Sequence, residues 1–182
     1  MTTWQKSILG LFALLLNACT GLPEGVKPVT PFASERYLGK WYEIARLDHS
    51  FERGLSQVSA TYSMRDDGGI SVINQGYDAA DQEWQLAEGK AYFVNGDNQG
   101  HLKVSFFGPF YGSYVVFGLD QADYQYAFVA GYNHDYLWLL ARTPTVSDAV
   151  KQDFIKQAQA LGFAVDQLIF VDQSQSPTPN QK

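Results

Sequence analysis

Polar and apolar residues alternate along most of the chain in short runs that are separated by turn-forming residues. Runs of this kind, repeated every ~8–12 residues, are typical of antiparallel barrels and sandwiches. Residues 66–69 (DDGG) and Asn95-Gly96 tolerate positive φ and therefore predict tight hairpins. Eight strands are expected, and they span residues 41–48, 57–64, 70–77, 84–94, 102–107, 113–120, 126–132 and 136–142.

Residues 147–161 have a helical pattern instead. Their apolar side chains recur at helical spacing, Pro144 precedes them, and Gly162 follows at a typical C-terminal position. This helix has one apolar face, which must pack on another surface, and the outside of the sheet is the available one. Residues 168–171 (LIFV) suit a short final strand. We therefore expect an all-β, eight-stranded antiparallel up-and-down barrel with one C-terminal α-helix packed outside.

The alternation also predicts which side chains point into the barrel. On the fourth strand, Glu88 and Lys90 are expected to face water, which turns the odd-numbered residues 89–93 inward. Eight strands enclose a space that large side chains fill and small side chains leave open. The predicted inward residues include both small and aromatic side chains. The barrel interior can therefore be either hollow or filled.

The first residues have the features of a secretion signal. Lys6 gives a positive charge, and residues 8–16 (ILGLFALLL) form an apolar run shorter than the ~20 residues of a membrane-spanning helix. Residues 1–18 are interpreted as a cleavable signal peptide. Residues 16–19 (LNAC) resemble the lipobox of bacterial lipoproteins, which makes Cys19 the predicted lipidation site. The alternative is that Cys19 is a buried free cysteine.

The predicted location is the outer membrane, on its periplasmic side. Thr20 follows Cys19, and by analogy with lipoprotein sorting in Gram-negative bacteria a residue other than Asp there implies the outer membrane. Removal of residues 1–18 takes away one lysine and no acidic residue, which leaves a net charge of −7. Such an acidic protein is poorly attracted to a membrane surface, so attachment is expected to come from the acyl chains at Cys19.

The rest of the chain divides into three parts. Residues 19–33 contain three prolines and lack periodicity, so they are interpreted as a lipidated N-terminus and tether. Residues 173–182 are polar and are expected to form a flexible tail. Residues 34–172 between them have the length of a single domain.

Composition excludes several classes of function. The whole chain has a net charge of −6 and a pI near 4.9, without a run of Lys or Arg, so no nucleic-acid partner is expected. A single cysteine cannot form an internal disulfide or a multi-thiolate zinc site. His49, His101 and His134 are far apart and lack the spacing of metal ligands. We therefore predict neither a metal ion nor a cofactor.

Three short motifs occur in order along the chain. Gly39-Lys40-Trp41 lies at the first predicted strand, Asp123-Tyr124 lies between the sixth and seventh, and Arg142-Thr143-Pro144 ends the eighth. Together they resemble the motifs of the lipocalin family. Residues 41–46 (WYEIAR) and 137–144 (LWLLARTP) are similar to the bacterial outer-membrane lipocalins, which are relatives of apolipoprotein D. The resemblance covers nearly all of the chain after residue 19 and implies a hollow, lipid-binding barrel.

Gly39, Trp41 and Arg142 are expected to close one end of the barrel. Gly39 permits a tight turn into the first strand, and the Trp41 indole can plug the end. The Arg142 guanidinium can lie on this indole and donate hydrogen bonds to backbone carbonyls of the preceding segment. We interpret these residues as structural, and Asp123-Tyr124 as a turn-stabilising pair.

Parity counted from Trp41 and Arg142 predicts an apolar tube that suits an acyl chain with its head group at the open end. The expected cavity residues are Glu43, Ala45, Val58, Ala60, Tyr62, Ala91, Phe93, Val104, Phe106, Tyr114, Val116, Trp138 and Leu140. A buried Glu43 needs a proton or a partner, so it either pairs with a basic or hydroxyl group near the closed end or meets a polar group of the ligand. Residues 108–112 (GPFYG) either pack into the fold or form an exposed apolar contact. The lipocalin resemblance implies fatty acids or lysophospholipids as ligands, and self-association into a homodimer.

Two other functions remain as alternatives. A hydrolase acting on such lipids would need a nucleophile, but the sequence shows no GxSxG motif or Ser-His-Asp arrangement. An integral outer-membrane barrel would need an apolar exterior, whereas Glu88, Lys90 and Lys103 are expected there. A non-catalytic, lipid-binding lipoprotein is therefore the leading interpretation.

Overall fold

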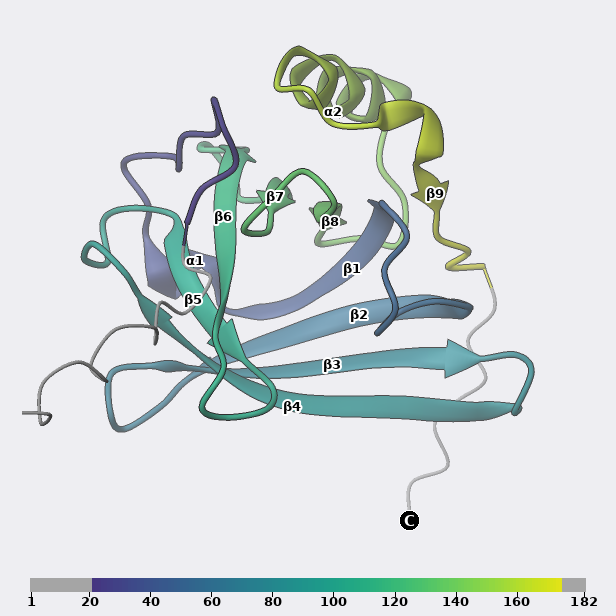
Figure 1. The fold of residues 1–182 in the computed structure, drawn as a ribbon, viewed down its shortest axis with the longest axis horizontal. Helices are drawn as coiled ribbons and strands as arrows, with labels where there is room; N and C mark the ends of the chain where they lie inside the picture. Colours follow the sequence, from purple (N-terminus) through teal and green to yellow (C-terminus); the bar gives the residue numbers. More distant parts are fainter. Residues whose placement is uncertain (1–20, 175–182) are drawn as a thin grey trace, which may run out of the picture.

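Strands dominate the structure, a computed structural model that describes residues 21–174 (Figure 1). The elements are α1 (Ser34–Tyr37), β1 (Gly39–Arg46), β2 (Leu55–Met64), β3 (Ile70–Asp78), β4 (Glu83–Phe93), β5 (His101–Ser105), β6 (Gly112–Leu119), β7 (Tyr126–Ala130), β8 (Leu137–Ala141), α2 (Asp148–Ala160), a short 3₁₀ helix (Val165–Gln167) and β9 (Ile169–Phe170). No helix in this part of the chain is both long enough and apolar enough to cross a membrane.

The first eight strands form a closed antiparallel barrel. Neighbours in sequence pair with each other, and β1 closes the sheet because it pairs with both β2 and β8. Trp41 lies opposite Ala60 on β2, and Tyr42 lies opposite Ala141 on β8. The short β9 adds to β1 at Ala45. The predicted barrel, with its external helix and final strand, is confirmed.

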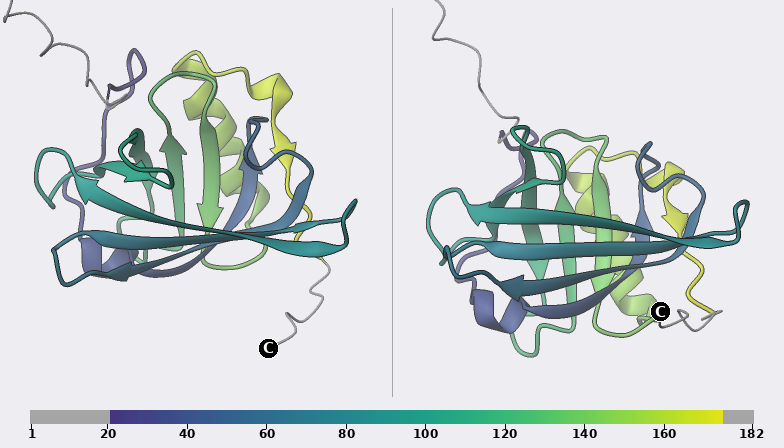
Figure 2. Two further views of the ribbon diagram at one scale, coloured as in Figure 1. Left: turned by 60° about the horizontal axis from the view of Figure 1, so that its bottom comes forward. Right: turned by 90° about the horizontal axis from the view of Figure 1, so that it is seen from below.

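The barrel wall separates two hydrophobic cores. One lies inside the barrel around Trp41, and the other lies between the barrel and α2. Phe154 of α2 is fully buried, and its ring centroid lies 5.2 Å from that of Phe128 on β7. The Ser147 hydroxyl caps α2 by accepting a hydrogen bond from the Val150 amide at 3.3 Å. Figure 2 shows α2 behind β7 and β8, on the opposite side of the barrel from β3 and β4.

Residues 21–33, expected to be part of a tether, pack against the barrel instead. Val26 is buried in the outer core and Phe32 in the inner one. The Val29 amide donates to the Val116 carbonyl at 2.8 Å, and the Gly100 amide donates to the Val29 carbonyl at 3.0 Å. The prolines of this segment predicted a linker, but its apolar side chains Val26 and Phe32 pack into the hydrophobic cores of the barrel.

The predicted tail and the N-terminal predictions fall mostly outside the described residues. Gln173, expected to begin the tail, donates from Nε2 to the carbonyls of Glu43 and Val58 at 2.8 and 2.9 Å. The signal peptide (residues 1–18), Cys19 and residues 175–182 lie outside the part of the chain that the structure describes.

The hairpin of β3 and β4 extends beyond the neighbouring strands (Figure 1). β5 pairs with β4 only from Lys90 to Phe93, whereas β3 pairs with β4 along its whole length. The barrel is therefore open at the end where the β1–β2, β3–β4, β5–β6 and β7–β8 loops lie. We call this the open end. The opposite end, next to α1 and Trp41, is the closed end.

Candidate ligand-binding site

A mainly apolar cavity of about 100 Å³ lies inside the barrel. The residues expected from parity that the structure places on its wall are Glu43, Val58, Ala60, Tyr62, Ala91, Val104, Phe106, Tyr114, Trp138 and Leu140. Gly89 lies beside this wall, and a Cβ added there would be 2.8 Å from Phe106 Cδ1. Glycine at this position therefore lets the Phe106 ring cross β4 closely.

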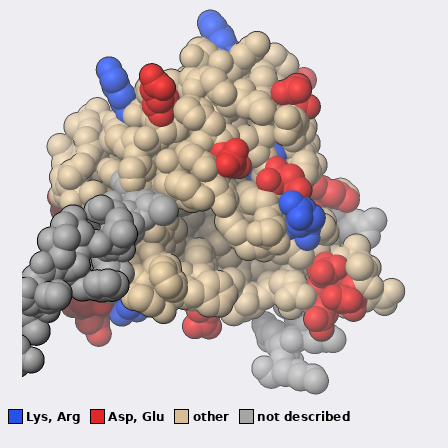
Figure 3. Space-filling view, viewed as in Figure 1, with Lys and Arg blue, Asp and Glu red and all other residues tan. Residues whose placement is uncertain are grey.

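The cavity widens toward the open end into a vestibule of about 610 Å³. The two spaces adjoin each other, because Phe51, Asn74 and Phe106 line both. The vestibule lies between the protruding β3–β4 hairpin and the β5–β6 loop, which contribute Leu86 and Phe107. Figure 3 shows the hollow in this face, bordered mainly by uncharged residues. The interior is thus an elongated space, blocked at one end and open at the other.

Ala45 does not line the cavity, which corrects the parity assignment. It is fully buried in the outer core with Ile44. The register of β1 against β8 shifts between Glu43 and Ala45, as at a β-bulge. A bulge adds one residue to a strand and changes the alternation after it, so Arg46 takes the inward place beside Glu43.

Phe93 and Val116 are also absent from the described cavity wall. Both belong to the inner cluster that includes Phe32, whose ring centroid lies 6.3 Å from that of Phe93. Val116 is fully buried and its backbone bonds to Val29. The two side chains belong to the interior, but the packed N-terminal segment fills the closed end in front of them.

Trp41 blocks the closed end of the barrel. Its side chain is fully buried, and the indole N–H donates to the Tyr37 carbonyl at 2.8 Å. The guanidinium carbon of Arg142 lies 3.9 Å from the indole centroid, within range of a cation–π interaction. The indole is therefore fixed both at its edge and on its face.

Arg142 joins three backbone segments at this end. Its guanidinium donates to the carbonyls of Arg36, Lys40 and Tyr124 at 2.6, 3.0 and 3.3 Å. Gly39 has a φ of +93°, and a Cβ added there would lie 3.4 Å from Arg142 Nη1. Glycine therefore allows both the left-handed backbone and the close approach of the guanidinium.

Tyr124 connects the second motif to the N-terminal segment. Its hydroxyl accepts a hydrogen bond from the Ala33 amide at 3.0 Å, and the Arg36 guanidinium lies 4.2 Å from its ring centroid. Its own amide donates to Asp120 at 2.8 Å within the turn. The three sequence motifs thus meet at the closed end.

Three tyrosine hydroxyl groups meet on the cavity wall near the closed end. The Tyr114 hydroxyl lies 2.7 Å from that of Tyr37 and 3.0 Å from that of Tyr62, and the Tyr37 ring is 4.7 Å from Trp41. Burial raises the pKa of all three phenols, so they remain protonated. The inner part of the cavity therefore has neutral polar groups.

A charged cluster lies toward the open end. Glu43 Oε1 accepts a hydrogen bond from Arg46 Nη1 at 2.6 Å, and both side chains are buried. Glu52 Oε2 lies 3.0 Å from His49 Nε2 and accepts a hydrogen bond from Trp138 Nε1 at 3.1 Å. The partner of Glu43 is thus a basic group, but it lies toward the open end and not near the closed end.

The two carboxyl groups of this cluster have opposite pKa shifts. Burial raises the pKa of Glu43 well above its usual value, and the charge of Glu52 raises it further, although Arg46 opposes both effects. Burial also acts to raise the pKa of Glu52, but the hydrogen bonds from His49 and Trp138 and the charge of His49 lower it overall. Glu43 therefore tends to hold the proton, while Glu52 is ionised.

A Glu43→Gln substitution is expected to make the protein more stable than the wild type at about pH 8, with little change at about pH 4. Because the pKa of Glu43 is raised on folding, the folded protein keeps a proton that the unfolded chain releases above its usual pKa of 4.5. The contribution of Glu43 to wild-type stability therefore falls as pH rises through this range, whereas glutamine stays neutral and can still accept a hydrogen bond from Arg46. Chemical denaturation across this pH range measures the difference.

The matched control for this prediction is Glu52→Gln. The pKa of Glu52 is lowered, so its stabilising contribution is present above pH 4.5 and is lost as pH falls below that value. A Glu43→Gln difference that does not grow with pH would contradict the proton assignment.

Several residues of the site were not predicted from the sequence. Ile70 and Val72 alternate on β3 and line the cavity, so the same parity argument would have found them. Asn74 continues this alternation, and its Oδ1 is buried without a hydrogen-bond partner among the described residues. Phe51 and Glu52 lie on the β1–β2 loop, where no periodicity shows which side chains turn inward.

The chemical character of the site is that of a binding cavity. Its walls are mainly apolar, and it opens at one end. Its polar side chains are the three phenols, Ser59, Asn74, Ser113 and the carboxyl groups of Glu43 and Glu52. Within residues 21–174, no group of three or more His, Cys, Asp or Glu side chains is arranged to hold a metal ion. Such a lining suits an apolar molecule that carries a polar group at one end.

Comparison with known proteins gives the family. The profile of the lipocalin-like domain matches residues 33–173. The chain belongs to the lipocalin family. This lipocalin is 63% identical over 163 residues to the outer membrane lipoprotein Blc of Vibrio cholerae, covering 90% of this chain and 95% of the relative. Blc of Escherichia coli K12 is 55% identical over 163 residues, covering 88% and 92%.

More distant relatives and solved structures are also similar to this lipocalin. Apolipoprotein D of Bos taurus is 34% identical to this lipocalin over 119 residues, which is 62% of each chain. Insecticyanin of the tobacco hornworm Manduca sexta superposes with a TM-score of 0.68 at 22% identity, covering 85% of this lipocalin and 88% of that chain. The cockroach allergen Per a 4 gives a TM-score of 0.66 at 23% identity, covering 85% and 96%. The two solved structures show a common fold.

Proposed function

We propose that this lipocalin is a lipoprotein of the outer membrane, on its periplasmic side, that holds or transports fatty acids or lysophospholipids. The observation that carries the proposal is the shape of the interior, which is apolar, blocked by Trp41 and open through the vestibule. An acyl chain fits such a space with its head group in the vestibule. The names of the Blc relatives support the location, and membership of the lipocalin family supports binding without catalysis.

The polar groups near the open end favour a lysophospholipid over a fatty acid. Glu52 is ionised and lines both spaces, so it would repel a carboxylate head group. The buried Asn74 Oδ1 can accept a hydrogen bond from a hydroxyl group, such as that of a glycerol backbone. We therefore expect a palmitoyl lysophospholipid to bind more tightly than palmitate.

Fluorescence titration tests this proposal, because Trp138 lies on the cavity wall and serves as a probe. The full-length Cys19→Ala protein is titrated with palmitate and with palmitoyl lysophosphatidylcholine, and we expect saturable binding of both. Mass spectrometry of the recovered ligand separates the hydrolase alternative, which would release free fatty acid from the lysophospholipid. Absence of saturable binding would reject the proposed function.

Cys19→Ala in the full-length chain is expected to move the protein from the outer membrane to the soluble periplasmic fraction, still folded. The substitution removes the thiol that would carry the acyl chains, and the acidic domain has little electrostatic attraction to a membrane. Fractionation after a high-salt wash measures the change. Thr20→Asp is the matched control, because it keeps Cys19 and is expected to redirect an anchored protein to the inner membrane. Persistence of Cys19→Ala in washed outer membranes would show that the anchor is assigned wrongly.

A further inference from the structure

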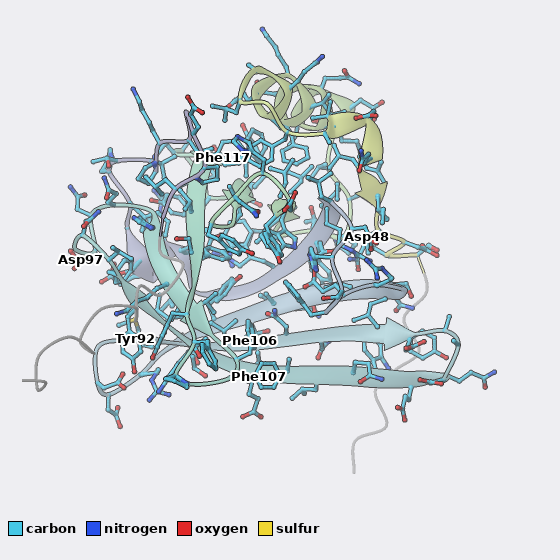
Figure 4. The ribbon with its side chains drawn as sticks, viewed as in Figure 1. Asp48, Tyr92, Asp97, Phe106, Phe107 and Phe117 are labelled. Atoms are coloured by element: carbon cyan, nitrogen blue, oxygen red, sulfur yellow. The ribbon has the colours of Figure 1, made fainter. Side chains whose placement is uncertain are left out.

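Exposed apolar side chains surround the vestibule. We call them the mouth rim, and they are Phe51, Leu86, Phe107, Phe110 and Tyr132. Phe107 and Phe110 are 82% and 73% exposed, and both lie on the β5–β6 loop, where Figure 4 labels Phe107. Residues 106–111 of this loop include no charged side chain. Apolar groups gathered around an opening mark an interaction surface.

The described chain begins beside this loop. Ser113, the second residue of β6, donates from its hydroxyl to the Gly21 carbonyl at 2.7 Å. Phe110 precedes Ser113 by three positions. From Gly21 the chain continues along the barrel to Phe32, which is buried at the closed end beside Tyr37. Gly21 is therefore held at the open end.

The predicted anchor is only two positions before Gly21. Two residues span at most about 7 Å, and three strand residues span about 10 Å. Covalent geometry therefore keeps the Cα atoms of Cys19 and Phe110 no more than about 25 Å apart, with the path through the Ser113 to Gly21 hydrogen bond included. Because residues 21–33 are packed on the barrel, no long linker separates the anchor from the mouth rim.

The charges near the open end indicate which kind of membrane surface fits. The β3–β4 hairpin carries Asp78, Asp81 and Glu83 at its tip, beyond the uncharged β5–β6 loop. Figure 3 shows acidic residues at that end of the molecule. Anionic lipids would repel these carboxylates at the edge of a contact between the mouth rim and a membrane. A zwitterionic lipid surface has no net charge, so it would not repel them.

From these observations we infer that the open end rests on the membrane leaflet to which Cys19 is anchored, with the mouth rim in contact with the lipid. The inference rests on the proposed function, because it requires Cys19 to be acylated. In this orientation the vestibule faces the bilayer, and a lipid enters the cavity without crossing water. The occupant of the mouth rim is a zwitterionic lipid surface.

Site-specific labelling tests the orientation. Cys19 is the only cysteine of the chain and its thiol is used in acylation, so a second cysteine can be labelled selectively. Acylated Phe107→Cys and Met64→Cys proteins carry a polarity-sensitive fluorophore and are reconstituted into dioleoylphosphatidylcholine vesicles that contain a spin-labelled phosphatidylcholine. Met64 is the matched control, because it is an exposed apolar residue at the other end of the barrel.

We expect the label at residue 107 to be quenched and shifted to shorter wavelength, and the label at residue 64 to remain in water. Anionic dioleoylphosphatidylglycerol in the vesicles is expected to reduce the effect. Equal quenching at both positions, or quenching at residue 64 alone, would overturn the orientation. Protein that fails to float with the vesicles would instead reject the anchor, which distinguishes failure of the proposed function from failure of the orientation.

Lipid transfer gives a second test. Phe107→Ser with Phe110→Ser is expected to slow transfer of a fluorescent lysophospholipid from these vesicles at least ~10-fold, which is more than any loss of affinity for the dissolved monomer, because both side chains also line the vestibule. An unchanged transfer rate would overturn the inference. The inference would also be overturned if a second copy of the chain covered the mouth rim. In that case Cys19→Ala protein would sediment as a dimer, and the same protein with the two serine substitutions would sediment as a monomer.

Discussion

Arg142→Ala is expected to lower the free energy of unfolding by about 2–4 kcal/mol and to leave ligand affinity within about twofold. The substitution removes the cation contact on Trp41 and three hydrogen bonds to backbone carbonyls, two of which belong to Arg36 and Lys40. These contacts lie outside the cavity, on the far side of the indole, so their loss acts on barrel closure. Thermal denaturation should show a melting temperature lower by roughly 4–16 °C.

Arg142→Lys is the informative control for this prediction. Lysine keeps the positive charge but lacks the planar group that reaches several carbonyls at once, so its stability is expected to be intermediate. A variant with an unchanged melting temperature and lost lipid binding would reverse the assignment and place Arg142 in the binding site.

Ala91→Trp is expected to weaken long-chain lipid binding at least ~10-fold while stability changes modestly. Ala91 is buried on the cavity wall, between Ile70 on β3 and Val104 on β5. The added ring would occupy volume that an acyl chain needs. If the interior were filled instead, the same ring would overpack it and cost ~1–3 kcal/mol or more. Titration and denaturation of the same variant distinguish the two outcomes.

Lys90→Trp provides a matched control on the neighbouring position of β4, where the side chain is exposed. This variant adds the same ring to the outside of the barrel, so its lipid affinity is expected to remain that of the wild type. A strongly destabilised Ala91→Trp protein, together with no saturable lipid binding by the wild type, would remove the support for a lipid carrier.

Sequence periodicity was sufficient for the barrel because each strand separates an inner from an outer side. The strand order, the external α2 and the short β9 followed from alternation and turn residues. The contact between Arg142 and Trp41 was accessible as well, because two motif residues at the ends of β8 and β1 must meet when the barrel closes. Local pattern and closure together therefore determine the fold.

What the sequence could not show were the interruptions of that alternation. The bulge between Glu43 and Ala45 moved Ala45 out of the cavity wall and turned Arg46 toward Glu43, because a period of two gives no sign of an inserted residue. Phe32 packs inside the closed end, although the prolines of its segment predicted a linker. Glu52 reached the site from a loop, where the direction of a side chain depends on the tertiary fold.

Because there are two hydrophobic cores, we expect local stability to differ between the two sides of the barrel. β7 and β8 are covered on both faces, by the interior and by α2, whereas most residues of β4 are exposed or only partly buried. Backbone amides of β7 and β8 should therefore exchange with deuterium far more slowly than those of the protruding β3–β4 hairpin. We therefore expect a thicker ligand to displace the β3–β4 hairpin rather than the helix-backed strands, which would leave the contacts of Trp41 unchanged.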